Sequence, residues 1–469
     1  MTQTYTYHEI FDAMRKVVPA SVQIYLVGGA VRDILQNKKI KDFDFVAEGL
    51  VRPIGKKLAR ELNGKYYVMD DERNIVRVIL NHDSNDCYCI DIAQFTGPNL
   101  NEDLLSRDFT INAIAIDFMQ KNIVVDPLMG AADLQKKRLR MCSIDSLEKD
   151  PLRAMRAIRM ALEYSLTMDA ELIAAIKGVV PLFPSCSMER YRDEFFKILA
   201  LEKTSSAIQL LEKFGFLSFM FQTNLDDEIQ PLLSFSRSID HLLNILTKTF
   251  NEEESSNLFS GLTVLKIGKF REQLKEFFDD SISMIHDHRS LLLFTLIASS
   301  YHIDSHEKRA DVIKKRAKTI ILSADEIKYS SSVYAAWQQL KSDELDQELS
   351  DTQLYRYYRK FASYGIDGLF LYLADSFCSN NSQTDINHWT KILERCVKYL
   401  DAWFNRFFEI VKPEKLISGN QLSEVLNIPS GPKIGMIKEA ITEAQIEKKI
   451  STYEEAIVFA KKILLEPNE

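Results

Sequence analysis

The hydrophobic pattern of the chain changes near residue 146, and this change limits the architectures that the chain can adopt. Before it, short apolar runs alternate with helical stretches and turn residues, which is typical of an α/β block. After it, apolar residues recur every three or four positions, which predicts helices only. Strands are expected within 22–31, in KDFDFVAEG, near 65–69, 75–80 and 87–94, and at 122–125, with helices from RDILQNKK, over 51–63 and near 110–115.

The helical part carries its spacing most clearly in PLRAMRAIRMALEY, AELIAAIKGVV and RYRDEFFKILALE. Polar stretches around 222–230 and 377–387 are candidate boundaries or long loops. Near the C-terminus, GPKIG is expected to be a tight turn between small helices. Together these features predict four parts of the chain, 1–140, 141–215, 216–410 and 411–469.

Composition excludes several classes of protein. A chain of 469 residues with 46% hydrophobic content can form several cores. Charges interrupt every apolar run before the ~20 residues that span a bilayer, and the first residues lack a signal-peptide pattern, so a cytoplasmic protein without membrane contact is expected. The six cysteines form no disulfide framework and are expected to be reduced. The net charge of −8 argues against nonspecific coating of nucleic acid.

Two aspartates stand two positions apart on a predicted strand. Asp42 and Asp44 therefore project their carboxylates from the same face. Two divalent ions about 3.5–4 Å apart need such carboxylates on a rigid element, where they stabilise the attacking oxygen and the leaving pyrophosphate of an in-line displacement. A solvent-facing polar strand edge has the same spacing, so the pair alone leaves both interpretations open.

A glycine pair precedes these aspartates at a strand-to-helix junction. Gly28 and Gly29 would let backbone N–H groups approach phosphate oxygens, and Arg32 can bind the same triphosphate through a bidentate contact. A plain strand–helix turn with a surface arginine is the alternative. A phosphate-binding turn next to a metal pair on adjoining strands favours nucleotidyl transfer.

Five sequence motifs resemble those of a known protein family. LVGGAVRDILQNKKIKDFDFV resembles the signature of the class II tRNA nucleotidyltransferase and bacterial poly(A) polymerase family, within the polymerase β-like nucleotidyltransferase superfamily. LLSRDFTINAIAID, DPLMGAADL, KDPLRAMRAIRMA and SMERYRDEFFKIL resemble its ribose, hinge, base-contacting and neck motifs, in that order. The resemblance covers about residues 22–200. It implies an α+β fold, a polymerase β-like nucleotidyltransferase head with a mixed sheet, followed by an all-α neck, body and tail.

The resemblance also implies roles for individual residues. Two Mg²⁺ ions would be held by Asp42, Asp44 and Asp91, the last an Asp where the family more usually has Glu, with a surface aspartate at a strand end as the alternative. Asp108 would accept a hydrogen bond from a ribose 2′-OH, unless it caps the helix at FTINA. The residues implied to contact the incoming nucleotide are Gly28, Gly29, Arg32, Arg107, Asp108, Asp150, Arg153, Arg156 and Arg159.

A local basic patch lies in this acidic protein. The stretch 136–160 holds eight Lys/Arg (136, 137, 138, 140, 149, 153, 156, 159) against three acids (145, 148, 150). Arg153, Arg156 and Arg159, three apart, lie along one side of a helix and can line a triphosphate and RNA path, although a solvated helix face has the same pattern. Asp150 with Arg153 offers one acceptor and several donors, as contact with the Watson–Crick edge of cytosine or adenine by protein side chains requires.

Two positions depart from the family pattern. Lys149 stands where the family usually has Glu before the Asp, which puts the network that supports base choice in doubt. Ser106 replaces the first arginine of the family's Arg-Arg-Asp, which removes one phosphate or RNA contact.

The motifs do not separate CC-adding, CCA-adding, A-adding and poly(A)-adding relatives. CCA- and A-adding relatives carry an Arg- and Pro-rich loop after the third carboxylate strand, and here only QFTGPNLNE follows Ala93, without a basic residue. This favours addition of CC to tRNA from CTP. A full CCA-adding enzyme that also uses ATP, a poly(A) polymerase and a catalytically idle RNA-binding protein remain the alternatives.

The C-terminal half is placed like the phosphohydrolase-related domain of some relatives, but its metal signature is incomplete. LLLFTLIASSYHID has Ser-Ser where a His-Asp pair would stand, and His286, Asp287 and His288 are expected to be solvated loop residues. A degenerate, non-hydrolytic body is therefore expected over 216–410. With the 411–469 tail it would hold the tRNA by shape and phosphate contacts. The sequence does not give the oligomeric state.

Overall fold

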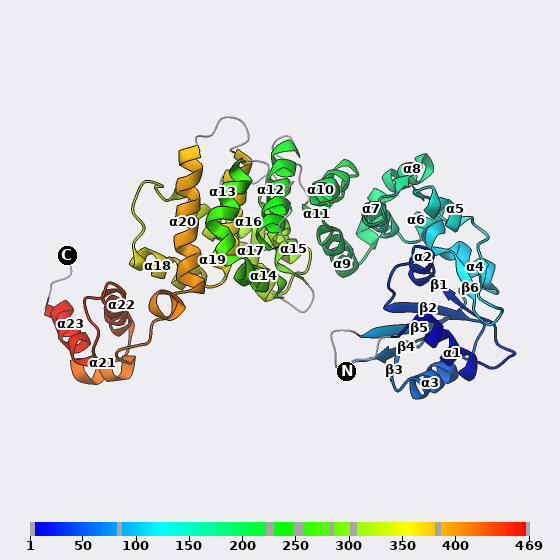
Figure 1. Cartoon of the computed structure of the whole chain (residues 1–469), viewed down its shortest axis with the longest axis horizontal. Coiled ribbons are helices and arrows are strands. Elements are labelled where there is room, and N and C mark those ends of the chain that lie inside the picture. Colours follow the sequence, from blue (N-terminus) through cyan, green and yellow to red (C-terminus); the bar gives the residue numbers. More distant parts are fainter. Residues whose placement is uncertain are drawn as a thin grey trace. The chain divides into compact units, whose positions relative to one another are not determined.

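The computed structural model describes residues 5–81, 87–221, 229–247, 258–280, 286–300, 307–379 and 386–465. The described chain divides into two compact units, Met1–Ile198 with Lys213–Phe216, and Leu199–Glu212 with Leu217–Glu469. The first unit contains the sheet and the second is helical (Figure 1). No helix among the described residues is long and apolar enough to cross a membrane. The finer division into four parts stays a prediction.

A seven-stranded sheet forms the centre of the first unit, in the order β3-β4-β5-β2-β1-β6-β7. Neighbouring strands pair antiparallel except β2 and β5, which pair parallel, so the sheet is mixed as expected. Its strands are β1 (Ile24–Val27), β2 (Asp42–Ala47), β3 (Lys65–Asp70), β4 (Ile75–Leu80), β5 (Tyr88–Gln94), β6 (Ala115–Asp117) and β7 (Ile123–Val125).

The alternation of side chains along β2 separates a core face from a polar face. Phe43 and Phe45 are buried in a cluster with residues of α1 (Tyr7–Val17), α2 (Gly29–Leu35) and α3 (Val51–Glu61). Asp42 and Asp44 point to the other face because successive side chains of a strand alternate. The alternation of apolar and polar residues along β2 thus determines which side chains lie on the polar face of the sheet.

The remaining elements of the first unit follow the sheet. They are α4 (Leu100–Ser106), the short helix η1 (Thr110–Asn112), α5 (Gly130–Gln135), β8 (Arg138–Leu139), α6 (Ser146–Lys149), α7 (Arg153–Glu163), β9 (Thr167–Met168), α8 (Ala170–Val179), the 3₁₀ helix η2 (Val180–Ser185) and α9 (Met188–Leu199). The three helices expected from the clearest helical spacing are confirmed as α7, α8 and α9.

Several sequence-based expectations about elements were wrong in detail. The helix near 110–115 is a single 3₁₀ turn that leads into β6, because the chain must rejoin the sheet beside β1. The part after residue 146 is not purely helical, since β9 pairs with β8. Helices α1 and α4 were not predicted; a capping box at Thr6 starts α1.

The second unit is built from helices (Figure 1). Helices α10 (Thr204–Lys213) and α11 (Phe216–Phe221) lie in the stretch of sequence where the chain crosses from the first unit to the second. The helices that follow are α12 (Ile229–Thr247), α13 (Leu258–Ile267), a 3₁₀ turn (Gly268–Phe270), α14 (Arg271–Asp279), α15 (His288–Ser300), α16 (Arg309–Thr319), α17 (Ala324–Ser342), α18 (Asp351–Phe361), α19 (Tyr364–Ser379), α20 (Ile386–Phe404), a π-helical turn (Phe407–Val411), α21 (Gly419–Leu426), α22 (Pro432–Ile446) and α23 (Tyr453–Leu465).

The last three helices share a core of their own, made of apolar residues between Ile417 and Ala460. The segment GPKIG is not a free-standing turn there, because Gly431 caps α22 and Pro432 begins it. Of the two expected polar stretches, 222–228 and 380–385 lie outside the described residues, and their flanks belong to helices.

Two of the three residues expected to be solvated, His286 and His288, are buried, so that expectation was wrong for them. His286 is 5% exposed and its Nδ1 lies 2.6 Å from Glu326 Oε1. His288 is 7% exposed and its Nδ1 lies 2.9 Å from Asp367 Oδ1. Hydrogen bonds to residues about 40 and 80 positions away along the chain offset the cost of burying these rings. The spacing of residues in the sequence does not reveal these partners. Asp287 is exposed and accepts from Ser290 N.

Candidate active site

Three aspartates lie beside one another on the polar face of the sheet. Asp42 and Asp44 come from β2, and Asp91 on β5 is the parallel register partner of Asp44. All three line a cavity of about 890 Å³. The strand spacing predicted for Asp42 and Asp44 is confirmed, and the sheet brings Asp91 to them.

The carboxylates repel one another. Burial raises the pKa of Asp44, and the neighbouring Asp91 and Asp42 raise it further, while Arg107 and Arg77 act in the opposite direction. A divalent cation would offset this repulsion, and carboxylate oxygens are the donors that Mg²⁺ prefers. Asp42 and Asp44 therefore fit a hard divalent cation in charge and in donor type. Within the described part of the chain, however, no group of three or more His, Cys, Asp or Glu side chains already converges as a metal site.

Asp91 has a partner that the sequence did not suggest. Arg77, its antiparallel register partner on β4, donates from Nε to Oδ1 and from Nη2 to Oδ2, each at 2.7 Å. Both carboxylate oxygens are engaged in this bidentate contact. Asp91 thus lies next to Asp44 while its charge is held by an arginine.

The glycine pair forms the turn between β1 and α2 at the edge of the cavity. Gly28 has φ +74°, which favours glycine, and a Cβ there would lie 3.2 Å from Arg107 Nη1 and 3.4 Å from Asp44 Oδ2. Gly29 begins α2, so N–H groups of its first turn are available to an anion. The pair leaves space beside the aspartates that a side chain would fill.

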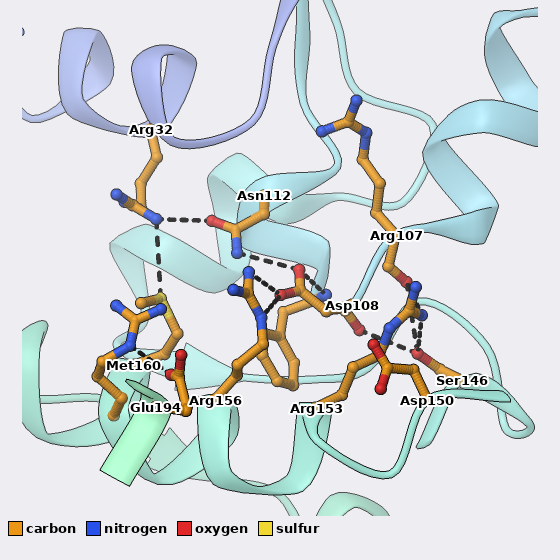
Figure 2. Close-up of polar contacts among 12 residues, drawn as sticks. Arg32, Arg107, Asp108, Asn112, Ser146, Asp150, Arg153, Arg156, Met160 and Glu194 are labelled. Atoms are coloured by element: carbon orange, nitrogen blue, oxygen red, sulfur yellow. Dashed lines mark hydrogen bonds and ion pairs between the residues drawn. The ribbon is translucent and has the colours of Figure 1, made fainter. Parts of the chain in front are cut away.

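Arg32 lies buried beside this turn. It is 6% exposed, and its Nη1 donates to Asn112 Oδ1 at 2.6 Å (Figure 2). Its Nη2 donates to the Tyr164 hydroxyl, and its guanidinium lies 4.0 Å from the centre of that ring. The residue lines the cavity, but its donors are used within the protein. A direct contact with a triphosphate stays a prediction.

Asp108 is held by Arg156 across the space between α4 and α7. Arg156 Nε and Nη2 donate to Asp108 Oδ2 at 2.9 and 2.6 Å, and Asn112 Nδ2 donates to Oδ1 at 3.1 Å (Figure 2). Burial disfavours the charged form, but Arg156 and the hydrogen bonds of Asn112 and Phe109 N outweigh it and lower the pKa of Asp108. Asp108 does not cap η1, whose N-cap is Phe109.

A second cavity, of about 430 Å³, lies over the start of α7. Asp150 accepts there from Arg190 Nη2 at 2.7 Å. Arg153 Nη1 donates to the backbone oxygen of Arg107 at 3.1 Å (Figure 2). Its Nη2 donates to the backbone oxygen of Ser106 at 2.8 Å. The two residues expected to contact a base are therefore already held by the protein.

Arg107 and Arg159 complete the charged lining. Arg107 lines both cavities and donates from Nε and Nη2 to Asp103 Oδ2 at 3.2 and 3.1 Å. Arg159 donates to Glu194 Oε1 at 2.5 Å and to Glu163 Oε2 at 2.9 Å. Each arginine is thus paired with a carboxylate.

The structure brings the residues implied by the family motifs to these two cavities. Gly28, Gly29, Arg32, Asp42, Asp44, Asp91, Arg107, Arg156 and Arg159 line the first, and Asp108, Asp150 and Arg153, again with Arg107 and Arg156, line the second. Sequence reasoning missed Arg77, Tyr164, Arg190 and Lys197, which also line them. Arg190 and Lys197 belong to the motif SMERYRDEFFKIL, and the alternation in IVRVIL sets Arg77 apart from its apolar neighbours.

Comparisons with known proteins find similar domains and similar whole chains. Residues 24–140 match the model of the poly A polymerase head domain, and residues 165–226 match a probable RNA- and SrmB-binding site of polymerase A. The chain is 27% identical over 444 residues to a CC-adding tRNA nucleotidyltransferase of Synechocystis sp., covering 94% of both chains. It is 28% identical over 453 residues to an A-adding tRNA nucleotidyltransferase of Deinococcus radiodurans, covering 93% of this chain and 94% of the other.

Solved structures share the fold. A CCA-adding enzyme in an apo form matches with a TM-score of 0.67 at 20% identity, over 98% of this chain and 94% of the other. The Thermotoga maritima CCA-adding enzyme complexed with tRNA matches with a TM-score of 0.62 at 19% identity, over 97% and 95%. The expected fold, an α+β head followed by helical parts, is confirmed.

Proposed function

Because the chain belongs to the class II tRNA nucleotidyltransferase and bacterial poly(A) polymerase family, whose members are enzymes, we propose that it adds CC to the 3′ end of tRNA from CTP. The terminal 3′-OH would attack the α-phosphate and pyrophosphate would leave. The observation that carries this proposal is the set of aspartates Asp42, Asp44 and Asp91 beside the Gly28-Gly29 turn, at one end of a cavity lined by arginines.

Asp42 and Asp44 would hold the metal ions, two Mg²⁺ with Asp91 as a further ligand. Bound divalent ions would stabilise the attacking oxygen and the leaving pyrophosphate. The glycine turn would accept phosphate oxygens at the first N–H groups of α2. Arg107 and Arg159 would then face the triphosphate, since both line the same cavity.

The second cavity would hold the base and the ribose. Asp150 offers acceptors and Arg153 offers donors, which suits the Watson–Crick edge of cytosine. Asp108, charged and fixed by Arg156, would accept a hydrogen bond from a 2′-OH and so distinguish ribonucleotides from deoxyribonucleotides. The protein itself would take the place of a template.

The choice of CC over CCA rests on the short connection after β5. The strand ends at Gln94 and α4 begins at Leu100, and Thr96 N donates to Asp103 Oδ1 at 2.9 Å. This leaves residues 95–99 between two fixed points, too few for a long mobile loop. Relatives named CC-adding and A-adding both match along nearly the whole chain, so overall similarity does not separate these activities. The short connection between β5 and α4 is therefore what supports addition of CC.

Binding of the tRNA would involve the second unit. RNA helices are recognised mainly by shape and phosphate contacts, which suits an extended series of helices. The helical body and the tail core between Ile417 and Ala460 would hold the RNA while its 3′ end reaches the cavity.

The test is incorporation on tRNA transcripts that end before CCA, after C and after CC, with CTP and ATP supplied separately and together. Growth that stops after CC supports the proposal. Completion with one A would make this a CCA-adding enzyme, and long ATP-dependent tails on unstructured RNA would make it a poly(A) polymerase. Failure to use CTP on any of these transcripts would refute tRNA cytidylyl transfer.

A further inference from the structure

Arg77 forms an ion pair with Asp91, one of the three aspartates that line the first cavity. On β5, Asp91 is flanked by Asp44 on one neighbouring strand and by Arg77 on the other, each in register with it. The two parallel hydrogen bonds of 2.7 Å from Arg77 use both oxygens of Asp91. This is the geometry in which a guanidinium binds a carboxylate most strongly.

The other two aspartates have no such partner among the contacts of the described residues. Asp42 is exposed and Asp44 lies in the cavity beside Gly28, where a Cβ would come within 3.4 Å of its Oδ2. The described part of the chain also holds no converging group of three metal-ligating side chains. Two carboxylates are thus open to a cation and the third is engaged by Arg77.

We propose that Arg77 makes the two metal sites unequal: Asp42 and Asp44 bind one divalent ion, and a second binds only when Asp91 turns away from Arg77. This inference rests on the proposed function in taking these aspartates as metal ligands. Arg77 is then a positioning residue that acts through Asp91. It holds the third carboxylate in place without a metal and raises the concentration of divalent ion that the second site needs.

Two physical effects give this result. The second ion must replace the bidentate contact of Arg77 before it gains the oxygens of Asp91, so part of its binding energy is lost. It must also bind near a fixed positive charge, which repels a divalent ion even through water. The lost contact affects only the site that includes Asp91. The charge of Arg77 also reaches Asp44, so it affects the Asp42–Asp44 site as well, but less than the site that it contacts directly.

The experiment counts metal ions directly on the full chain. Mn²⁺ is titrated in the presence of a CTP analogue with a non-hydrolysable α,β bond, without RNA, and free Mn²⁺ is followed by electron paramagnetic resonance. The wild type is expected to bind one ion tightly and one weakly. Arg77→Gln removes the charge and the contact, and is expected to tighten the weak site about tenfold. The tight site should stay within about twofold of its wild-type value.

Three further variants make the test specific. Arg77→Lys keeps the charge but loses the two-pronged contact, and an intermediate effect is expected. Asp91→Asn should abolish the weak site. Arg73→Gln is the matched control, because Arg73 lies on the turn between β3 and β4, is 81% exposed and pairs with Asp70 at 3.9 Å. It should bind Mn²⁺ as the wild type does.

Several results would overturn the inference. Two equal sites in the wild type, or unchanged Mn²⁺ affinities in Arg77→Gln with the same circular dichroism as wild type, would make Arg77 a strand-pairing residue only. Retention of both sites in Asp91→Asn would remove Asp91 from the metal site. CMP transfer is assayed separately, so the proposed function can fail while Mn²⁺ binding follows these expectations, or stand while it does not.

Discussion

The pair of Asp108 and Arg156 allows a prediction whose magnitude follows from the structure. Arg156→Ala removes two charged hydrogen bonds, of 2.9 and 2.6 Å, from a carboxylate whose side chain is 8% exposed. Breaking a buried ion pair from one side costs about 3–5 kcal/mol. Because the Arg156 side chain is 36% exposed, water screens the pair, and a loss of about 2–3 kcal/mol is expected at pH 7.

The pH dependence of the stability provides a second test of the same pair. The folded-state pKa of Asp108 is lowered, so its contribution to stability is present above the unfolded pKa and is lost as the pH falls through the folded pKa. Without Arg156, burial dominates and raises that pKa. The deficit of Arg156→Ala relative to wild type should therefore shrink as the pH is lowered from 7.5 toward 5, where Asp108 takes up a proton.

The assay must report on the first unit. All three tryptophans, Trp337, Trp389 and Trp403, belong to the second unit, so their fluorescence serves as an internal reference and should not shift. Hydrogen exchange of peptides from α7, measured by mass spectrometry in increasing urea, should show the loss. Destabilisation of α7 by less than about 0.5 kcal/mol at pH 7, or a deficit that does not change with pH, would contradict this prediction.

Two controls separate the buried pair from a general effect of removing an arginine. Arg138→Ala breaks the pair with Asp169 at 3.2 Å, but Arg138 is 50% exposed, and a loss below about 1 kcal/mol is expected. Arg156→Ala combined with Asp108→Asn removes the unpaired charge, so the double variant should be more stable than the sum of the single losses implies.

Three further outcomes are expected. Asp44→Asn should abolish CMP transfer while folding slightly better than wild type above pH 6, because the pKa of Asp44 is raised by burial and its charge therefore disfavours the folded state; unfolding and activity are measured on the same sample. Arg190→Ala frees Asp150 from its 2.7 Å partner and should lower the ratio of CTP to ATP use several-fold, measured as kcat/KM for each. At pH 8, N-ethylmaleimide should label exposed Cys87 well before Cys142, whose pKa burial raises to about 12; equal labelling by mass spectrometry would contradict this.

The parts of the site that lie close together in the sequence were predictable. Asp42 and Asp44 follow from a period of two along one strand, and the turn at Gly28 follows from glycine at a strand–helix junction. The apolar partners of the same strand, Phe43 and Phe45, fix its orientation over α1 and α3. Each of these features is decided within a few residues, where sterics and burial leave one solution.

The pairing of distant residues was not predictable in the same way. The contact of Arg77 with Asp91 depends on the register of β4 against β5, and one residue of slip would send Arg77 to the other face. The buried pair of His288 with Asp367 joins α15 to α19, and the sequence shows neither partner as buried. Ion pairs across a fold are chosen by tertiary geometry, which local pattern does not contain.

The contacts of Asp150 and Arg153 bear on how such a site can choose a base. Both are paired within the protein, Asp150 with Arg190 and Arg153 with the carbonyl oxygens of Ser106 and Arg107. A base that binds them exchanges one set of charge-assisted hydrogen bonds for another, so the net gain is small for a matching base and negative for one that leaves a donor unpaired. If these residues contact the base as proposed, selectivity would depend on how firmly Arg190 holds Asp150, because a firmer pair would reject every base that matches it less well.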